Sequence, residues 1–331
     1  MSKLITPLAN SKLKLHNRLV MPPMATAKAD ENGNITDAIL DYYNEKSQGG
    51  YISLIILEHS YIDANGRVRD RQISASDDSV IEPLKRLTDM VHGNGSKIAM
   101  QINHAGSATL KSVGLGIVGP SAVPHPTAKT VPSSLNIPQI HKIIDEFQAS
   151  AVRAQKAGFD AVEIHSAHGY LLNQFYSPLT NLRTDEYGGN LHNRIRIHLE
   201  IIKAIRHAVG PDFPILLRFG GCDYMPGGST VADSVSAAFE FEKAGVDILD
   251  ISGGFCGYIN PNSAKAGYFS DVSSPVKQAI SIPVILTGGI TTALQAEDLL
   301  SCGAADLIGV GRAIMNDSDW AAKAIKFFKL A

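Results

Sequence analysis

Cysteine is scarce in this chain, and the few cysteines follow no pattern. The 331 residues include three, Cys222, Cys256 and Cys302, which are odd in number and widely spaced. Such spacing provides neither a disulfide framework nor the ligand pattern of a metal site. We therefore expect no bound metal and a reducing, cytoplasmic compartment.

Long apolar runs and a strong excess of one charge are also missing. No apolar run approaches the length of a membrane span, and the first fifteen residues lack the apolar core of a signal peptide. The formal net charge is −2, so we expect no nucleic-acid or membrane partner. A content of 44% hydrophobic and 19% charged residues is ordinary for a globular protein.

No G-x-G-x-x-G turn directly follows any of the early apolar segments. This absence counts against a doubly wound open sheet, the main competing architecture. Short apolar segments alternate with helical patterns, which predicts a parallel sheet, and eight such segments are the number that closes a barrel. The predicted strands are Leu19–Met21, Ile52–Leu57, Lys97–Ile102, Asp160–Ile164, Pro214–Phe219, Val246–Ile251, Val284–Thr287 and Leu307–Val310. We predict an α/β fold, a (β/α)8 TIM barrel, as one domain over residues 1–331.

The loops that follow the predicted strands differ in length. The loop after the third strand is long, over roughly residues 103–136, and rich in Gly, Pro and Ser. In a barrel this loop lies at the C-terminal ends of the strands, where active sites are built.

A helix is predicted between Leu191 and Val209, because apolar residues recur there at helical spacing.

Two histidines and a tyrosine come directly after the fourth predicted strand, in VEIHSAHGYLLNQFYSPLTNLRTDEYGG, residues 162–189. His165 and His168 are three residues apart, so one turn of helix or a tight loop puts both imidazoles on one side. Adjacent imidazoles can bind an oxygen that carries or gains negative charge, and the hydroxyl of Tyr170 can supply a proton. An ordinary polar loop is the alternative, but the clustering at a strand end favours a catalytic site.

This stretch strongly resembles the signature of the Old Yellow Enzyme family of flavin-dependent ene-reductases, and the resemblance extends from about Leu4 to about Asn316. It implies an FMN-dependent oxidoreductase that takes hydride from NADH or NADPH and reduces the C=C bond of an α,β-unsaturated carbonyl or nitro compound. In that reaction His165 and His168 would hold the substrate oxygen, and Tyr170 would protonate the α-carbon. A small-molecule alkene is the expected partner, and a homo-oligomer is an open possibility.

Further residues at predicted strand ends match flavin contacts of the family. The side-chain amide of Gln101 offers both a donor and an acceptor, which suits the pyrimidine edge of a flavin. Without the family resemblance, a solvent-exposed glutamine at a strand end would be the simpler interpretation. Arg218 would stabilise the negative charge of reduced flavin, and without the resemblance a structural ion pair would be the better reading. The full set of expected cofactor-binding residues is Pro23, Met24, Ala25, His59, Gln101, Arg218, Ser252, Gly253, Gly288, Gly289, Gly311 and Arg312.

Two glycine-containing turns follow the last two predicted strands. Gly288 and Gly289 follow the seventh, and Gly311 and Arg312 follow the eighth. Loops at these two positions often form a phosphate site in barrels, because glycine lets backbone N–H groups approach the anion. Arg312 can add a bidentate clamp, so we expect the FMN phosphate here.

The chain departs from the family pattern at several positions. Ser107 occupies the position where the family pattern has an arginine after His-Ala-Gly, and near Ala27 this chain lacks a tyrosine that compact relatives have. The C-terminal tail also lacks the arginine that in some relatives reaches into the neighbouring subunit's site. The substrate range of relatives is therefore not transferred. Ala25 replaces a usual cysteine or threonine, and His59 replaces a usual alanine or glycine. We hypothesise that the imidazole of His59 donates the flavin hydrogen bond that residue 25 has lost; an imidazole that points away and merely packs is the alternative.

Two functions of other classes compete with the reductase. A phosphate-binding isomerase or lyase without flavin would share the glycine turns but would not need Gln101, Arg218 and the histidine pair together. A flavoprotein that has lost catalysis would not need His165, His168 and Tyr170.

Overall fold

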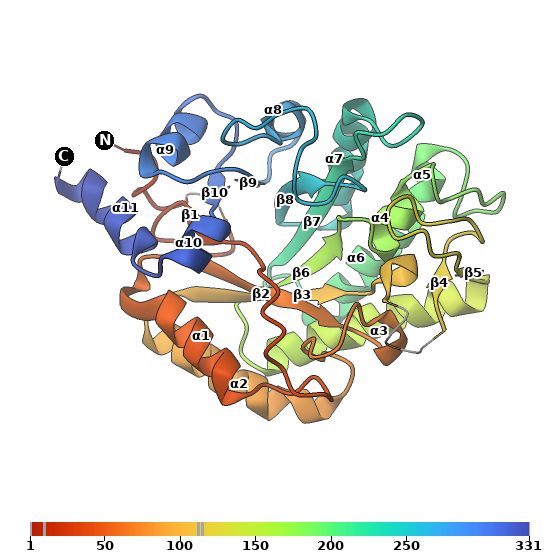
Figure 1. The fold of residues 1–331 in the computed structure, drawn as a ribbon, viewed down its shortest axis with the longest axis horizontal. Coiled ribbons are helices and arrows are strands. Elements are labelled where there is room, and N and C mark those ends of the chain that lie inside the picture. Colours follow the sequence, from red (N-terminus) through yellow and green to blue (C-terminus); the bar gives the residue numbers. More distant parts are fainter. Residues whose placement is uncertain (1, 9–10, 111–112, 114–115, 331) are drawn as a thin grey trace.

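Eight parallel strands close into a barrel in the order β1-β10-β9-β8-β7-β6-β3-β2 (Figure 1). The structure is a computed structural model and describes residues 2–8, 11–110, 113 and 116–330. The barrel strands are β1 Leu19–Met21, β2 Leu54–Tyr61, β3 Lys97–Asn103, β6 Ala161–Ser166, β7 Ile215–Cys222, β8 Ile248–Gly253, β9 Val284–Thr287 and β10 Leu307–Gly309. The predicted (β/α)8 barrel is confirmed.

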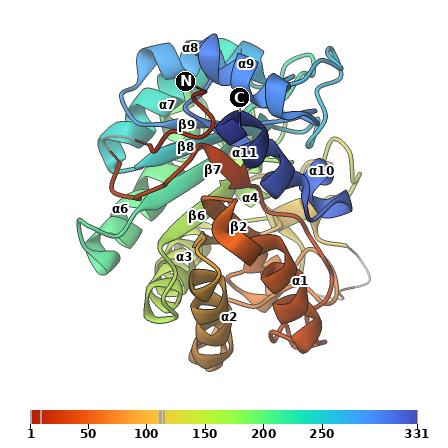
Figure 2. The same ribbon diagram turned by 90° about the vertical axis from the view of Figure 1, so that its left-hand side faces the viewer.

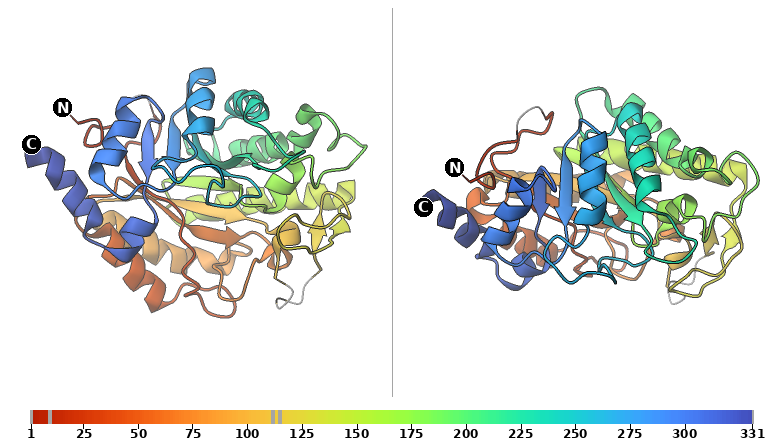
Figure 3. Two further views of the ribbon diagram at one scale, coloured as in Figure 1. Left: turned by 45° about the horizontal axis from the view of Figure 1, so that its top comes forward. Right: turned by 90° about the horizontal axis from the view of Figure 1, so that it is seen from above.

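Helices cover the outside of the barrel, as the view from above shows (Figure 3). They are α1 Asp37–Ser47, α2 Ile81–Gly93, α3 Ile137–Lys156, α4 Leu171–Tyr176, α5 Leu191–Arg194, α6 Arg196–Val209, α7 Val231–Ala244, α8 Ser270–Ala279, α9 Ala293–Ser301, α10 Arg312–Asn316 and α11 Trp320–Leu330. Helix α3 begins with a capping box, in which Asn136 and Gln139 bond each other's backbone N–H groups. Figure 2 shows the two ends of the chain on the same side of the molecule, near α9 and α11. Within the described ranges, no helix combines the length and apolar character that a membrane span needs.

The barrel interior is apolar at the N-terminal ends of the strands. One cluster joins inward-facing residues from the N-terminal halves of all eight strands with three leucines of the preceding segment, which cover that end of the barrel. Its members are Leu8, Leu13, Leu15, Val20, Leu54, Ile56, Ala99, Ala161, Leu216, Ile248, Ile285 and Leu307. Because side chains alternate along a strand, the next inward-facing residue lies two positions further on. On β2, where the register against β3 shifts between Leu57 and Ser60, the second position after Ile56 holds Glu58, which bonds Thr26 of the loop after β1. On five other strands this residue is polar: Gln101, Glu163, Arg218, Asp250 and Thr287. We refer to these five residues as the polar layer.

The loop after β3 has secondary structure that the sequence did not indicate. It contains a small parallel sheet of β4 (Val118–Gly119) and β5 (Ser133–Ser134), which lies beside α4 and outside the barrel (Figure 1). The loop runs from the end of β3 at Asn103 to the N-cap of α3 at Asn136, as predicted.

Several predicted element boundaries are wrong. Strand β2 continues to Tyr61, so Glu58, His59 and Ser60 lie within it at a shift of register against β3. Strands β6 and β7 also run further, to Ser166 and Cys222, which places His165 inside β6. Parallel strands buried on both faces have no polar alternation to mark their ends.

The predicted helix between Leu191 and Val209 is divided at Ile195 into α5 and α6, although Ile195 itself stays in the right-handed helical region with φ of −91°. The guanidinium of Arg194, the last residue of α5, donates to the carbonyls of Tyr176 and Gly189 at 2.8 Å each. The short α5 is thereby held against the segment that follows β6, and the apolar period continues across the break.

Replacement of Leu216 by Ala should destabilise the protein by about 2–5 kcal/mol, because the apolar floor of the barrel loses a buried side chain and cannot collapse around the cavity. Leu216 is fully buried, whereas Leu294 on α9 is 56% exposed and provides the matched control. Urea unfolding of both variants measures the difference. Equal losses for Leu216→Ala and Leu294→Ala would contradict the assignment of the floor.

Candidate active site at the C-terminal ends of the strands

The turn after β6 brings His165, His168 and Tyr170 together. His165 is in β6, His168 and Gly169 both have left-handed backbone conformations with φ of 59° and 73°, and Tyr170 precedes α4. Histidine is among the few non-glycine residues that adopt this conformation without severe strain. Two successive left-handed residues reverse the chain, so both imidazoles and the phenol face one another instead of following the strand direction.

The three rings are in edge-on contact. The ring centroids of His165 and His168 are 5.1 Å apart, those of His165 and Tyr170 are 4.8 Å apart, and those of His168 and Tyr170 are 6.4 Å apart. His59 of β2 stacks on Tyr170 with centroids 5.8 Å apart and planes 6° apart. On the other side, the ring of Tyr258 lies 6.4 Å from His168. The predicted pairing of the histidines with the tyrosine is therefore present in the fold.

Hydrogen bonds indicate where the imidazole protons lie. Nδ1 of His165 accepts from the backbone N–H of Ala167 at 3.2 Å, so its proton is on Nε2. Nε2 of His168 lies 2.7 Å from the hydroxyl of Ser252, and its backbone N–H donates to the carbonyl of Gly253. Burial, with Arg218 nearby, holds the pKa of both His165 and His168 well below the ordinary value. The pair is therefore neutral at neutral pH and can donate N–H hydrogen bonds without carrying charge.

The long loop after β3 helps to fix this turn. The carbonyl of Gly169 accepts from Nε2 of His125 at 2.9 Å and from Nε2 of Gln174 at 2.7 Å. Gln174 also bonds the backbone of Ala105 and Ser107 at 3.0 and 3.1 Å. Neither His125 nor Gln174 can be recognised from the sequence, because only the folded loop shows that both meet one carbonyl group.

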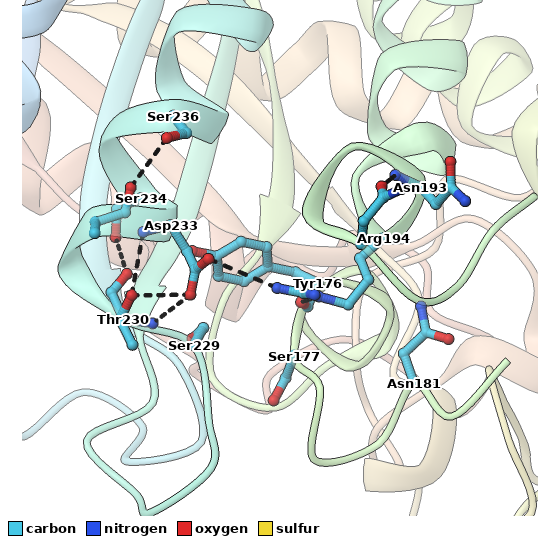
Figure 4. Close-up of polar contacts among 12 residues, drawn as sticks. Tyr176, Ser177, Asn181, Asn193, Arg194, Ser229, Thr230, Asp233, Ser234 and Ser236 are labelled. Carbon is cyan, nitrogen blue, oxygen red and sulfur yellow. Dashed lines mark hydrogen bonds and ion pairs between the residues drawn. The ribbon is translucent and has the colours of Figure 1, made fainter. Parts of the chain in front are cut away.

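A second set of contacts anchors the chain beyond the turn. Arg194 approaches Asp233 to 3.8 Å, and Asp233 accepts from the backbone N–H and hydroxyl of Thr230, which caps α7 (Figure 4). The buried carboxylate of Asp223 accepts from the hydroxyl of Ser177 at 2.6 Å and from the backbone N–H groups of Ser229 and Phe255 at 2.8 and 3.0 Å. One carboxylate thus connects the loops after β6, β7 and β8.

The polar layer has hydrogen-bonding capacity that the protein does not use. Nε2 of Gln101 donates to Glu163 at 2.8 Å, and Nη1 of Arg218 lies 3.1 Å from Asp250. In the described part of the chain, no hydrogen bond reaches Oε2 of Glu163, Nε or Nη1 of Arg218, either oxygen of Asp250, or Oγ1 of Thr287. Buried polar atoms without partners are costly, so a bound polar group above this layer would fit it.

The predicted glycine turns meet at one tyrosine. A Cβ on Gly288 or Gly289 would lie within 3 Å of the ring of Tyr268, so the aromatic ring packs directly on the turn. Nη2 of Arg312 lies 3.4 Å from the hydroxyl of Tyr268. The turns after β9 and β10 are therefore neighbours, as the sequence predicted, and Tyr268 is the residue between them that the sequence did not reveal.

The loop after β1 contacts both the glycine turn after β10 and the end of β2. Sδ of Met24 would be 2.8 Å from a Cβ on Gly311, and Thr26 donates to the carboxylate of Glu58 through both its backbone N–H and its hydroxyl. Ala25 precedes Thr26 and His59 follows Glu58, so the two departures from the family pattern flank one hydrogen-bonded contact. Nε2 of His59 is buried and receives no hydrogen bond from the residues described.

The pattern of the NADH:flavin oxidoreductase / NADH oxidase family matches residues 3–330. The chain belongs to this family. FMN is the cofactor that the family uses, and NADH or NADPH is the reductant. The unused donors and acceptors of the polar layer are of the kind that a flavin ring, with its mixed donor and acceptor edge, can satisfy.

Three relatives have related names and different lengths. The chain is 40% identical over 319 residues to an NADH oxidase of Thermoanaerobacter brockii, and 37% identical over 329 residues to a metal reductase of Desulforamulus reducens. These alignments cover 94% and 98% of this chain but 49% of each relative, so the chain spans about half of their length. An NADPH dehydrogenase of Clostridium acetobutylicum is 39% identical over 303 residues, which is 92% of this chain and 88% of the relative.

Among solved structures, a 2-naphthoyl-CoA reductase in complex with 2-naphthoyl-CoA matches with a TM-score of 0.91 and 25% identity. The match covers 98% of this chain and 52% of that protein. The resemblance to the Old Yellow Enzyme family, predicted from the stretch after β6, is confirmed.

Acid should destabilise the protein through the buried histidines. Burial lowers the pKa of His59 to about 4, so the unfolded chain binds a proton below about pH 6.5 that the folded site does not bind. Stability is therefore fully present above that pH and falls as the pH decreases towards 4. When the pH is lowered from 7 to 5, the free energy of unfolding of His59→Gln should fall by about 2 kcal/mol less than that of the wild type. Urea unfolding at both pH values tests this, with the exposed His207→Gln as control; equal losses in wild type and His59→Gln would contradict it.

Proposed function

We propose that this protein is an FMN-dependent NAD(P)H oxidoreductase that reduces activated C=C bonds of α,β-unsaturated carbonyl or nitro compounds. The observation that supports it most directly is the cluster of His165, His168 and Tyr170 at the mouth of the barrel, beside the unsatisfied polar layer. Two neutral imidazoles can hold an uncharged carbonyl or nitro oxygen and strengthen their hydrogen bonds as negative charge develops on it.

Residues from both regions described above would hold the cofactor. Gln101 and Arg218 would meet the pyrimidine edge of the ring, while Gly289, Gly311 and Arg312 would surround the phosphate. Pro23, Met24, Ala25, Ser252, Gly253 and Gly288 complete the proposed set, with one FMN in one barrel domain. When bound, FMN supplies hydride transfer from NAD(P)H to the alkene, and the protein supplies orientation and charge stabilisation.

On the substrate side, Nε2–H of His165 would donate to the substrate oxygen, because its Nδ1 is already occupied by the backbone. The hydroxyl of Ser252 would orient His168. Tyr170 would protonate the α-carbon as a neutral phenol; burial raises its pKa, which keeps the proton on the hydroxyl until it is transferred. His59 would bond the flavin through its free Nε2, which stays a prediction.

The visible spectrum of the purified protein tests the cofactor, and anaerobic titration with NADH, NADPH and cyclohexenone tests the reaction. A flavin spectrum that is bleached by reduced nicotinamide and restored by cyclohexenone is expected. A flavin that NAD(P)H reduces but that no activated alkene reoxidises would contradict the reductase proposal. The names of the relatives cover oxidase, metal reductase and dehydrogenase activities, so the acceptor has to be measured on this protein.

Arg312→Ala should weaken FMN binding by about 1.5–3 kcal/mol, because one charged hydrogen-bonding partner of the phosphate is lost. Fluorescence titration of the apoprotein with FMN measures this, and Arg86→Ala on α2 serves as control. The phosphate assignment predicts that riboflavin, which has no phosphate, binds both variants equally. An unchanged FMN affinity in Arg312→Ala would overturn it.

His165→Ala and His168→Ala should weaken binding of p-hydroxybenzaldehyde, whose phenol oxygen imitates the substrate oxygen, by about 1.5–3 kcal/mol each. The change in the flavin spectrum on phenol binding reports the dissociation constant. FMN should stay bound, since neither side chain is assigned to the cofactor. Unchanged phenol affinity in both variants would remove the pair from the substrate site.

Tyr170→Phe should slow alkene reduction by about 10²–10⁴-fold, which is the usual contribution of a positioned acid. Flavin reduction by NAD(P)H needs no proton on carbon and should change far less. Stopped-flow measurement of the two half-reactions separates them. If both rates fall by the same factor, Tyr170 is not the specific proton donor.

A further inference from the structure

The polar layer holds two carboxyl groups for one cation. Glu163 and Asp250 have no exposed surface and Arg218 is 4% exposed. Gln101 pairs in register with Glu163 across β3 and β6, and Arg218 pairs with Asp250 across β7 and β8. With both acids ionised, this layer would carry a net negative charge in the dry interior of the barrel. Burial of an uncompensated charge is strongly unfavourable, so one carboxyl group is expected to keep its proton.

The contacts show which acid is protonated. Oδ2 of Asp250 lies 3.1 Å from Nη1 of Arg218, whereas the one side-chain hydrogen bond that Glu163 makes with the described residues is to the neutral amide of Gln101, at 2.8 Å. Burial, with the charge of Asp250 added, raises the pKa of Glu163 well above its ordinary value. Burial raises the pKa of Asp250 to about 6, against the opposing effect of Arg218. At neutral pH, Asp250 is the ionised partner of Arg218, and Glu163 holds the proton.

The histidines around the layer add no charge at neutral pH. His165 follows Glu163 on β6 and is opposite Arg218 in register, and burial holds its pKa well below the ordinary value. His168 and His59 are also buried with lowered pKa values. From β3 and β9 the layer receives Gln101 and Thr287, which do not ionise. The charge that Arg218 presents is therefore controlled by the two carboxyl groups.

We propose that Asp250 is a positioning residue that offsets the charge of Arg218 towards the flavin, while Glu163 serves as a neutral, proton-holding acid. The inference rests on the proposed placement of FMN over Arg218. Hydride transfer to the flavin leaves negative charge on the ring. Arg218 stabilises that negative charge less than an unpaired arginine would, because Asp250 offsets part of the positive charge of the guanidinium. The pair thus keeps reduced FMN a better hydride donor than an unpaired arginine would.

Two conservative variants separate the roles. Asp250→Asn removes the counterion, so holoprotein should bind reduced FMN about tenfold or more tightly relative to oxidised FMN, which is a higher midpoint potential. Glu163→Gln replaces a neutral acid by a neutral amide of the same shape. It should change the ratio of the affinities for reduced and oxidised FMN by no more than about twofold. Asp212→Asn, an exposed charge outside the barrel, is the control for a loss of one negative charge. Anaerobic titration against a reference dye at pH 7 gives the potentials, with circular dichroism as the folding check.

A rise in potential for Glu163→Gln equal to that for Asp250→Asn would show that Glu163 is ionised and would overturn the inference. No rise for Asp250→Asn would overturn it as well. If Asp250→Asn does not fold, infrared spectroscopy of the wild type and Glu163→Gln decides. The carbonyl band of a buried protonated carboxyl group should be present in wild type and absent in the variant; a band that persists places the proton elsewhere. A wild-type protein that binds no FMN contradicts the proposed function, whereas bound FMN with unshifted potentials contradicts only this inference.

Discussion

The change from apolar to polar inside the barrel is the constraint on which the site depends. Inward-facing apolar residues from all eight strands build a dry floor, and two positions further along, five of the strands present amide, acid, guanidinium or hydroxyl groups. The floor excludes water, so charges above it cannot be screened and must pair or stay neutral. The ion pair of Arg218 with Asp250 and the contact of Glu163 with Gln101 are the result, together with several atoms that only a bound group can satisfy.

The same dry environment determines the chemistry of the histidines. Neutral imidazoles are poor partners for an isolated anion in water but good hydrogen-bond donors to an oxygen whose charge grows during reaction. Because burial disfavours a charged imidazole and Arg218 places a further cation nearby, His165 and His168 stay neutral. The left-handed turn at His168 and Gly169 then places both donors and the phenol of Tyr170 within contact of one another.

Loops that are distant in sequence hold this arrangement through a few shared partners. Gln174 connects the turn after β6 with the loop after β3, Asp223 connects three loops, and Tyr268 packs between the two glycine turns. Each of these residues is ordinary in the sequence, since a glutamine, an aspartate or a tyrosine in a loop has many uses. Their roles follow from hydrogen bonds and packing between segments whose proximity the local pattern cannot encode.

Sequence alone determined the barrel, the family, the region of the long loop and the grouping of His165, His168 and Tyr170, because alternating apolar segments and a dense local motif are both short-range signals. It could not determine where β2, β6 and β7 end, since strands buried on both faces lack alternation. Nor could it show that Asp250 is the acid that pairs with Arg218 while Glu163, which bonds Gln101, keeps its proton. That arrangement exists only once β6, β7 and β8 lie side by side, where burial makes the interaction of charges strong enough to control protonation.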